Sequence, residues 1–222
     1  MNNKNIQVVE TTHNGISLDE ELVECIQSYD NGLVLIKHPL CNSTHHPDLI
    51  ETNNNKFRYI KKRMEELEKQ EEWVKMIWDT ERPWRLDTFM KYEDKLTDKD
   101  YWETLGDIFM DTEFPFDRQK EWLERFSSKR KERENLVGDD DWDMYHNLPE
   151  KIQIWRGVNE EKYLDGMSWS LDKEQGEWFS RRFGDDGLCV EGYIHIENIL
   201  MCSVYENQIV CNPNNVIDKI IN

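Results

Sequence analysis

The chain has 222 residues, of which 46 are Asp or Glu and 28 are Lys or Arg, so its formal net charge is −18. A chain this acidic would be repelled by the phosphates of a nucleic acid unless its basic residues were gathered on one face, and we therefore exclude nucleic acid as a primary partner. The length suffices for one large domain or two small ones, and an aromatic content of 11% indicates a chain that folds.

The first zone, residues 1–55, mixes short apolar runs with Asn, Thr and His. Residues 33–36 form an apolar run that follows the turn signal Asn31-Gly32 and ends shortly before Pro39, which predicts a short buried strand. We predict a loop for residues 42–55.

Residues 57–146 predict helices, because apolar residues recur at helical spacing among long charged side chains. We expect the first helix to be interrupted at Glu71 and to end before Pro83. A second helix is predicted from about residue 84 to residue 95.

A third helix is indicated by Thr97, which can cap it, with Asp100 at the capping-box position. A fourth helix is expected to follow Pro115. Asp139, the first of a run of acidic residues, is expected to cap one further short helix.

The pattern changes after Pro149. Ile152 and Ile154 alternate with polar residues, and residues 188–196 and 208–211 also have the composition of strands. This last part of the chain therefore predicts a sheet.

One helix is expected among these strands, over residues 173–183, with Asp172 as its N-cap and Gly184 after its end. The chain as a whole predicts an α+β fold. We expect a mainly helical N-terminal region, residues 1–148, and a β-rich region, residues 149–222; the two either fold apart or form one compact unit.

The sequence also predicts the compartment. It has no apolar run long enough to span a membrane, and its first residues lack the apolar segment of a signal peptide. We expect a cytoplasmic protein without a membrane partner. Its five cysteines are odd in number and widely spaced, so reduced thiols with a structural role are expected.

Three short pieces of the last third carry a recognisable pattern: Arg156-Gly157 ends a strand, Ser168-Trp169-Ser170 leads into a helix, and Glu206-Asn207-Gln208 lies in a late strand. Their order and spacing resemble the Arg, Ser-x-Ser, Glu-x-Glu pattern of ADP-ribosyltransferases of the arginine-serine-glutamate class. The chain is also similar to a group of phage and bacterial proteins with this C-terminal signature. The resemblance implies an ADP-ribosyltransferase-like split β-sheet core that binds NAD in a cleft between two small sheets.

In that family the bond between nicotinamide and ribose breaks, and a nucleophile captures the resulting ribosyl cation. The resemblance makes Arg156 a clamp on the cofactor phosphates, and Gly157 the place where backbone approaches the cofactor. Ser168 would hold the ribose next to nicotinamide, while Ser170 supports the strand end. Phe183 is the aromatic residue expected to stack on nicotinamide.

The acidic position departs from the family pattern, because Gln208 stands where the catalytic Glu is expected. A carboxylate there stabilises a cation that exists only at the transition state, and a neutral amide should do so less well by a few kcal/mol, roughly the loss of one preorganised polar group. If Glu206 lies in the same strand, it points to the same side as Gln208 and would reach the ribose after a shift by one residue pair. The expected catalytic set is therefore Arg156, Ser168, Glu206 and Gln208.

The resemblance implies an NAD-dependent mono-ADP-ribosyltransferase that modifies a protein target, phage-encoded and directed at a host or defence factor in the host cytoplasm. Two alternatives remain open. A degenerate member of the fold would bind a partner protein, with its acidic surface as the recognition element, and an NAD glycohydrolase would let water capture the ribosyl cation. Ser170 and Asp172 are also explained by helix capping alone.

A metal site is not expected. His38, Cys41, His45 and His46 crowd one segment, and imidazole with thiolate can bind zinc, but their spacing matches no structural zinc module. We interpret this cluster as a surface loop.

Overall fold

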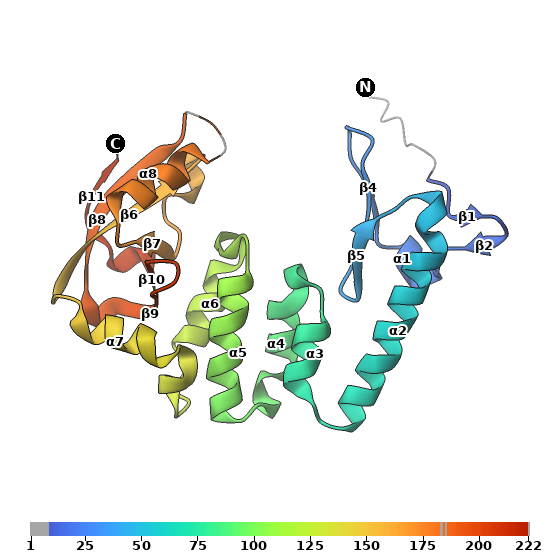
Figure 1. Ribbon diagram of the computed structural model, residues 1–222, viewed down its shortest axis with the longest axis horizontal. Helices are drawn as coiled ribbons and strands as arrows, with labels where there is room; N and C mark the ends of the chain where they lie inside the picture. The colour runs from blue at the N-terminus through green and yellow to red at the C-terminus, as the bar shows by residue number, and fades with distance from the viewer. Residues whose placement is uncertain (1–8, 183, 185, 222) are drawn as a thin grey trace. The chain divides into compact units, whose positions relative to one another are not determined.

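The computed structural model describes residues 9–182, 184 and 186–221 (Figure 1). The chain divides into two compact units, unit 1 up to Leu96 and unit 2 from Thr97 onward. The predicted boundary between residues 148 and 149 lies inside unit 2. It does so because the helix that ends at Asn147 packs against the same sheet as the strands that follow it.

Unit 1 begins with small antiparallel sheets. A two-residue hairpin is followed by a three-stranded sheet in the order β3-β4-β5, and the strand predicted at residues 33–36 is present as β4. The strands are β1 (Thr12–His13), β2 (Ile16–Ser17), β3 (Ile26–Ser28), β4 (Val34–His38) and β5 (Cys41–Thr44).

The helices of unit 1 follow the predicted apolar spacing and are α1 (Glu20–Val23), α2 (Ile50–Lys69), α3 (Trp73–Asp79) and α4 (Arg85–Tyr92). The predicted interruption at Glu71 is confirmed, since this residue has a left-handed backbone (φ 58°). Short 3-10 helices connect the elements at Pro47–Leu49, Arg82–Trp84 and Glu93–Lys95.

The loop predicted for residues 42–55 was wrong, because this segment contains β5 and the first turns of α2. Asn residues misled the prediction, since they favour turns in isolation. Here Asn53 is buried and its side chain bonds Ser43 Oγ (3.0 Å) and the Thr44 carbonyl (3.3 Å). Asn54 accepts from the Asp19 N–H (2.8 Å) and donates to the Ser17 carbonyl, so both amides serve tertiary contacts.

Unit 2 begins with helices that precede its sheet. Thr97 caps the first of them as predicted: its hydroxyl accepts from the Asp100 N–H (3.1 Å) and donates to the Asp100 carboxylate (2.7 Å). Asp139 is the first helical residue rather than the cap, which is Gly138. The helices are α5 (Asp98–Asp111), α6 (Gln119–Phe126), α7 (Asp139–Asn147) and α8 (Lys173–Arg181), with 3-10 turns at Pro115–Arg118, Arg133–Leu136, Glu161–Tyr163, Ile196–Asn198 and Pro213–Asn215.

The sheet of unit 2 has six antiparallel strands in the order β11-β8-β6-β7-β10-β9. The strands are β6 (Lys151–Val158), β7 (Ser168–Ser170), β8 (Leu188–His195), β9 (Ile199–Ser203), β10 (Gln208–Cys211) and β11 (Ile217–Ile221). The chain is thus an α+β protein, as predicted. Helix α8 follows β7 as predicted, with Asp172 as its N-cap (Gln175 N to Asp172 Oδ1, 2.8 Å).

The six strands fall into two halves. β6 and β8 share eight residue pairs and β8 and β11 share three; β10 shares three pairs with β7 and four with β9; β6 and β7 are joined by the single pair Trp155–Ser170. One face of the sheet carries the apolar core, including Ile154, Trp169 and Ile209, against which α7 packs through Met144 and Tyr145. The opposite face packs against α8.

The two edges of this sheet differ. At β9 the carbonyl of Leu200 accepts a hydrogen bond from Arg133 Nη2 (3.1 Å), and just beyond the strand the Val204 N–H donates to Asp141 Oδ1 (2.7 Å). At the other edge, β11 is exposed along its whole length and pairs with no further strand of the described residues. Among the helices described, none is long and apolar enough to cross a membrane.

Candidate functional site

The three segments singled out in the sequence lie on neighbouring strands. Arg156 is on β6, Ser168 and Ser170 are on β7, and Gln208 begins β10. Ser170 pairs directly with Trp155 on one side and with Gln208 on the other. Because directly paired residues of antiparallel strands point to the same side, Trp155, Ser170 and Gln208 form a row on one face, which we call the motif row.

Arg156 does not belong to this row. It follows Trp155 along β6 and pairs with Val190, a residue of the apolar core, so its side chain lies on the opposite face. Its donors are used within the chain: Nε donates to the Tyr163 carbonyl (3.0 Å) and Nη1 to the Ser168 carbonyl (2.7 Å). Arg156 was expected to bind the cofactor phosphates; in this structure its guanidinium instead joins β6 to the backbone at Tyr163 and Ser168.

The surroundings of this guanidinium are closely packed. A side chain at Gly166 would overlap the guanidinium of Arg156, so only glycine leaves room for it. Burial lowers the pKa of Arg156 to about 10, which still leaves it charged at neutral pH. Because the Arg156 guanidinium is buried, its charge and its N–H donors have to be stabilised by groups of the chain itself.

Gly157 has a role in packing. A Cβ here would overlap the carbonyl of Gly176 and the N–H of Ser180, both in α8. The residue therefore lets helix α8 approach strand β6 closely. The close approach expected at Gly157 is present, but its partner is a helix of the same chain.

Ser168 and Ser170 alternate with buried Trp169 and so face the same side as Gln208. The Ser170 hydroxyl donates to Gln175 Oε1 (2.7 Å) and accepts from the Asp172 N–H (3.1 Å). The expected support of the strand end by Ser170 is thus visible as bonds to the first turn of α8.

Gln175 is a residue that the sequence reasoning missed. Its Nε2 donates to the Glu206 carbonyl (2.8 Å) while its Oε1 accepts from Ser170, so one amide links β7, α8 and the turn before β10. The available signal was its position three residues after the N-cap Asp172, where a Gln or Glu completes a capping box. The same spacing marks the helix start at Thr97.

Glu206 lies in the turn that joins β9 to β10, not in a strand, so that prediction was wrong. The turn spans residues 204–207 and includes Asn207 in a left-handed conformation (φ 47°), which ends the strand alternation just before Gln208. The face-sharing argument for Glu206 therefore does not apply. Gln208 itself is half-buried, and its Nε2 lies 3.5 Å from Met110 Sδ.

The acidic residue paired into the motif row is Glu191. Glu191 points to the same face, but it pairs with Trp155 at the far end of the row, roughly 14 Å from Gln208 at three strand spacings. Its carboxylate accepts from Gln153 Nε2 (2.7 Å). Within the motif row the Ser170 hydroxyl is buried and is used as donor and acceptor inside the chain, so a ligand would meet the half-buried Gln208 amide, which suits a sugar hydroxyl better than it stabilises a cation.

The other residues expected to help bind NAD do not contact the motif row in the interactions described. Phe183, expected to stack on nicotinamide, lies outside the described residues. Arg181 faces Glu177 on its own helix (3.6 Å), and the Arg182 guanidinium lies over the exposed Trp178 ring at 5.7 Å. Neither arginine contacts a residue of the motif row in these interactions.

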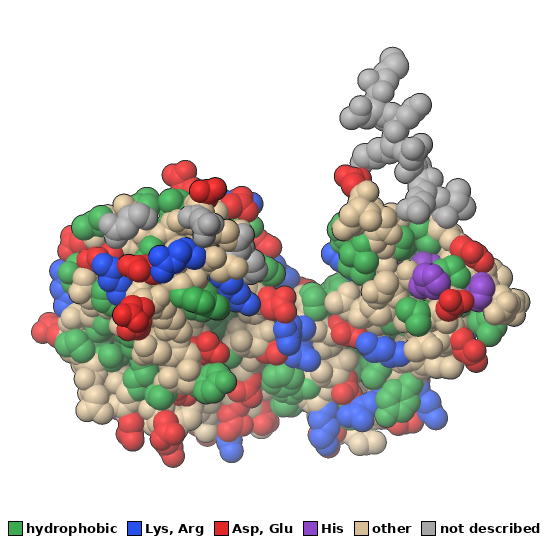
Figure 2. Space-filling model, turned by 45° about the horizontal axis from the view of Figure 1, so that its top comes forward, with side chains coloured by type: hydrophobic (Ala, Val, Ile, Leu, Met, Phe, Trp, Pro, Cys, Tyr) green, Lys and Arg blue, Asp and Glu red, His purple; other side chains and the backbone are tan. Residues whose placement is uncertain are grey.

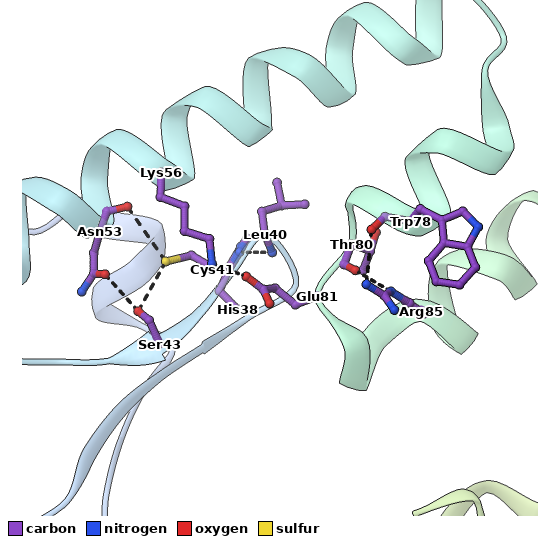
Figure 3. Close-up of polar contacts among 10 residues, drawn as sticks. All are labelled: His38, Leu40, Cys41, Ser43, Asn53, Lys56, Trp78, Thr80, Glu81 and Arg85. Atoms are coloured by element: carbon purple, nitrogen blue, oxygen red, sulfur yellow. Dashed lines mark hydrogen bonds and ion pairs between the residues drawn. The ribbon is translucent and has the colours of Figure 1, made fainter. Parts of the chain in front are cut away.

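The histidine and cysteine cluster of unit 1 is part of a hydrogen-bonded region (Figure 3). Cys41 is buried, with its Sγ 3.7 Å from Ser43 Oγ and 3.9 Å from the Asn53 carbonyl, and burial raises its thiol pKa. His38 Nδ1 accepts from the Leu40 N–H (3.0 Å). Lys56 pairs with Glu81 beside this hairpin (2.6 Å).

Histidine side chains are visible on one side of the surface of unit 1, beside acidic side chains (Figure 2). His13 and His46 both lie against Asp48, at 3.0 and 3.5 Å, while the buried His45 bonds the Glu10 carbonyl through Nε2 (2.8 Å). In the described part of the chain, no group of three or more His, Cys, Asp or Glu side chains is placed to hold a metal ion.

Comparison of the chain with protein-family models, with curated proteins and with solved structures finds no match.

Proposed function

We propose that unit 2 is an ADP-ribosyltransferase-type domain that takes NAD as its substrate and transfers ADP-ribose to a protein target. One observation carries the proposal: the segments that match the family's three motifs, far apart in sequence, lie on adjacent strands, with Ser170 and Gln208 directly paired. A chance resemblance of short motifs gives no reason for that adjacency.

The division of the sheet supports the same proposal. The family binds NAD between two small sheets, and here two three-stranded halves meet at a single residue pair, Trp155–Ser170. A substrate bound beside that junction would lie along the motif row. The half-buried Gln208 amide is suited to hold a ribose hydroxyl, while the buried Ser170 hydroxyl fixes the start of α8 beside it.

The proposal gives Arg156 a positioning role. Its guanidinium holds the Ser168 carbonyl and the Tyr163 carbonyl, so it fixes β7 relative to β6 without touching the substrate. The phosphates of NAD would then be neutralised less well than in the family pattern, and binding should be correspondingly weak.

A second candidate function is a domain that binds a protein partner and has lost turnover. Two observations favour it: Gln208 supplies no negative charge where the ribosyl cation forms, and Arg156 is turned to the face opposite the motif row. The acidic side chains spread over the visible surface of unit 2 (Figure 2) would then serve recognition of a basic partner.

The decisive experiment adds the missing carboxylate. The full chain and its Gln208→Glu variant are incubated with adenylate-labelled NAD and a cell extract, and nicotinamide release and label on protein are both measured. We expect Gln208→Glu to raise the rate of nicotinamide release by a factor on the order of 100, because a preorganised charge at a developing cation contributes a few kcal/mol. Glu206→Gln, two residues away in the turn, is the matched control and should leave the rate unchanged.

The outcomes separate the candidates. Label on a protein supports the transferase, whereas nicotinamide release without labelled protein indicates a glycohydrolase. If neither the wild type nor Gln208→Glu releases nicotinamide and NAD does not raise the melting temperature of either, the transferase proposal is rejected and partner binding remains. Saturating NAD at about a hundred times its Kd would stabilise a binding-competent chain by about 2.7 kcal/mol.

A further inference from the structure

A cavity of 330 Å³ lies in unit 2 at the outer edge of β9, lined by residues of that strand, of α7 and of the 3-10 turn before it. Its volume falls at the lower end of the roughly 300–1,000 Å³ typical of small-molecule sites. Met201 and Leu200 supply apolar surface, and Trp142 and Tyr145 form an aromatic corner, with ring centroids 5.6 Å apart and an interplanar angle of 82°.

Arg133 is the cation of this cavity. Its Nη1 and Nη2 donate to the carbonyls of Phe126 (2.5 Å) and Leu200 (3.1 Å), and its guanidinium lies over the Trp102 ring at 4.8 Å. No carboxylate among the described residues comes within ion-pair distance of it. Burial lowers the pKa of Arg133, as expected for a cation that lacks a counter-ion.

The acidic groups of the lining are engaged elsewhere. Asp141 accepts the Val204 N–H, and Glu197 is exposed to solvent at the rim. Arg133 binds the carbonyl of Leu200 near the start of β9, whereas Asp141 binds the N–H of Val204, just beyond its end. Asp141 therefore leaves the charge of Arg133 uncompensated, while the two acids together disfavour a ligand with more than one negative charge.

We infer that this cavity binds a small aromatic monocarboxylate, with its carboxylate on Arg133 and its ring in the corner formed by Trp142 and Tyr145. A guanidinium has five N–H donors, so Arg133, with two of them engaged by carbonyls, still has three that can bind a carboxylate. The indole N–H of Trp142 already donates to the Glu134 carbonyl (2.6 Å), and the Tyr145 hydroxyl is 3.4 Å from the Ile196 carbonyl, so both rings offer apolar surface. This site is separate from the motif row and does not depend on the function proposed for it.

The test uses the full chain and three small probes: phenylacetate, its neutral analogue phenylacetamide, and inorganic phosphate. Binding is followed by ligand-observed NMR and by Trp fluorescence. We expect phenylacetate to bind at least ten times more tightly than phenylacetamide, and phosphate not to compete with it. Equal binding of phenylacetate and phenylacetamide would overturn the inference.

Variants locate the site. Arg133→Gln should weaken phenylacetate binding at least tenfold, and Arg130→Gln is the matched control, because Arg130 pairs with Asp98 (3.1 Å) and does not line the cavity. Val137→Phe fills the cavity while keeping Arg133 and should also abolish binding in a chain with unchanged circular dichroism. If Val137→Phe folds and still binds phenylacetate, the ligand lies elsewhere and the inference fails.

Discussion

Arg156 joins three segments through one side chain. Its two bonded carbonyls belong to the 3-10 turn at Tyr163 and to β7, while the residue itself lies in β6. Removing the guanidinium leaves both carbonyls unpaired beside a space that the side chain filled, and each unsatisfied group carries a desolvation cost.

We expect Arg156→Ala to lower the free energy of unfolding by about 3 kcal/mol. Arg156→Lys should recover only part of this, because an ammonium cannot reproduce the fork that reaches two carbonyls. Arg181→Ala, on the exposed side of α8, should cost less than about 0.5 kcal/mol, since its ion pair with Glu177 is solvent-exposed. Urea unfolding of the three variants measures the differences in the free energy of unfolding. If Arg156→Ala is as stable as the wild type, Arg156 does not stabilise the fold by joining these segments.

At this scale the sequence identified the positions but not their orientation. The strand assignments of Arg156 and Gln208 are correct, because alternation and turn signals are local, whereas the short strand β7 that holds Ser170 was not predicted. Whether Arg156 faces a ligand or the core depends on the register with β8 and β7, which is a long-range property. Glu206 was misplaced for a local reason, since the left-handed turn at Asn207 has no signal as strong as a glycine.

Helix α8 packs closely against strand β6. Its N-cap was readable from the sequence, but its end at Arg181, with Arg182 rather than Gly184 as the C-cap, and its closeness to β6 were not. That closeness depends on two glycines that face each other, Gly157 in the strand and Gly176 in the helix; a Cβ on Gly176 would press on the Trp155 side chain. Strand and helix therefore approach nearer than residues with side chains permit.

We expect Gly157→Ala to destabilise unit 2 by about 2 kcal/mol, because the new methyl group overlaps backbone atoms of α8 that cannot move alone. The matched control is Gly138→Ala, whose Cβ would meet only the Asp141 side chain at 3.9 Å and whose φ of −72° suits alanine. Because Gly138 is the N-cap of α7, that change should cost no more than about 1 kcal/mol, the difference between glycine and alanine at such a position. Thermal unfolding of both variants provides the comparison, and similar losses in both would show that the packing of α8 is looser than described.

Each of the two units contains cysteines whose burial can be compared. All five cysteines are free; Cys25 is half-buried and the other four are buried. Burial raises the pKa of Cys202 and of Cys211 to about 12, so neither forms the reactive thiolate near neutral pH. Cys25 and Cys41 belong to unit 1, and the remaining three belong to unit 2.

A small alkylating reagent at pH 8 should therefore label Cys25 at least ten times faster than the other thiols, as followed by mass spectrometry of the peptides. Burial and the nearby Glu24 and Glu21 raise the pKa of Cys25, so even this thiol should react more slowly than a free one. In low urea, labelling of Cys41 reports the opening of unit 1 and labelling of Cys211 that of unit 2. Fast labelling of Cys211 in the native chain would contradict the described core.

The division of the chain was the least predictable feature at this scale. Composition changes near Pro149, where strands replace helices, and the sequence therefore placed a boundary there. The structure divides after Leu96 because domains are set by which elements share a core, and α7 contributes Met144 and Tyr145 to the core of the sheet. Composition follows secondary structure and does not report this sharing.

The unequal edges of the unit 2 sheet have a consequence for how copies of the chain behave when concentrated. Arg133 and Asp141 occupy backbone groups beside β9, so strand addition there would first have to displace them. β11 presents an open backbone edge with exposed Ile217, Ile220 and Ile221. With a net charge of −18, copies of the chain repel one another, and salt that screens this repulsion would favour pairing of two β11 edges; association would then stop at a dimer, because the β9 edges are occupied.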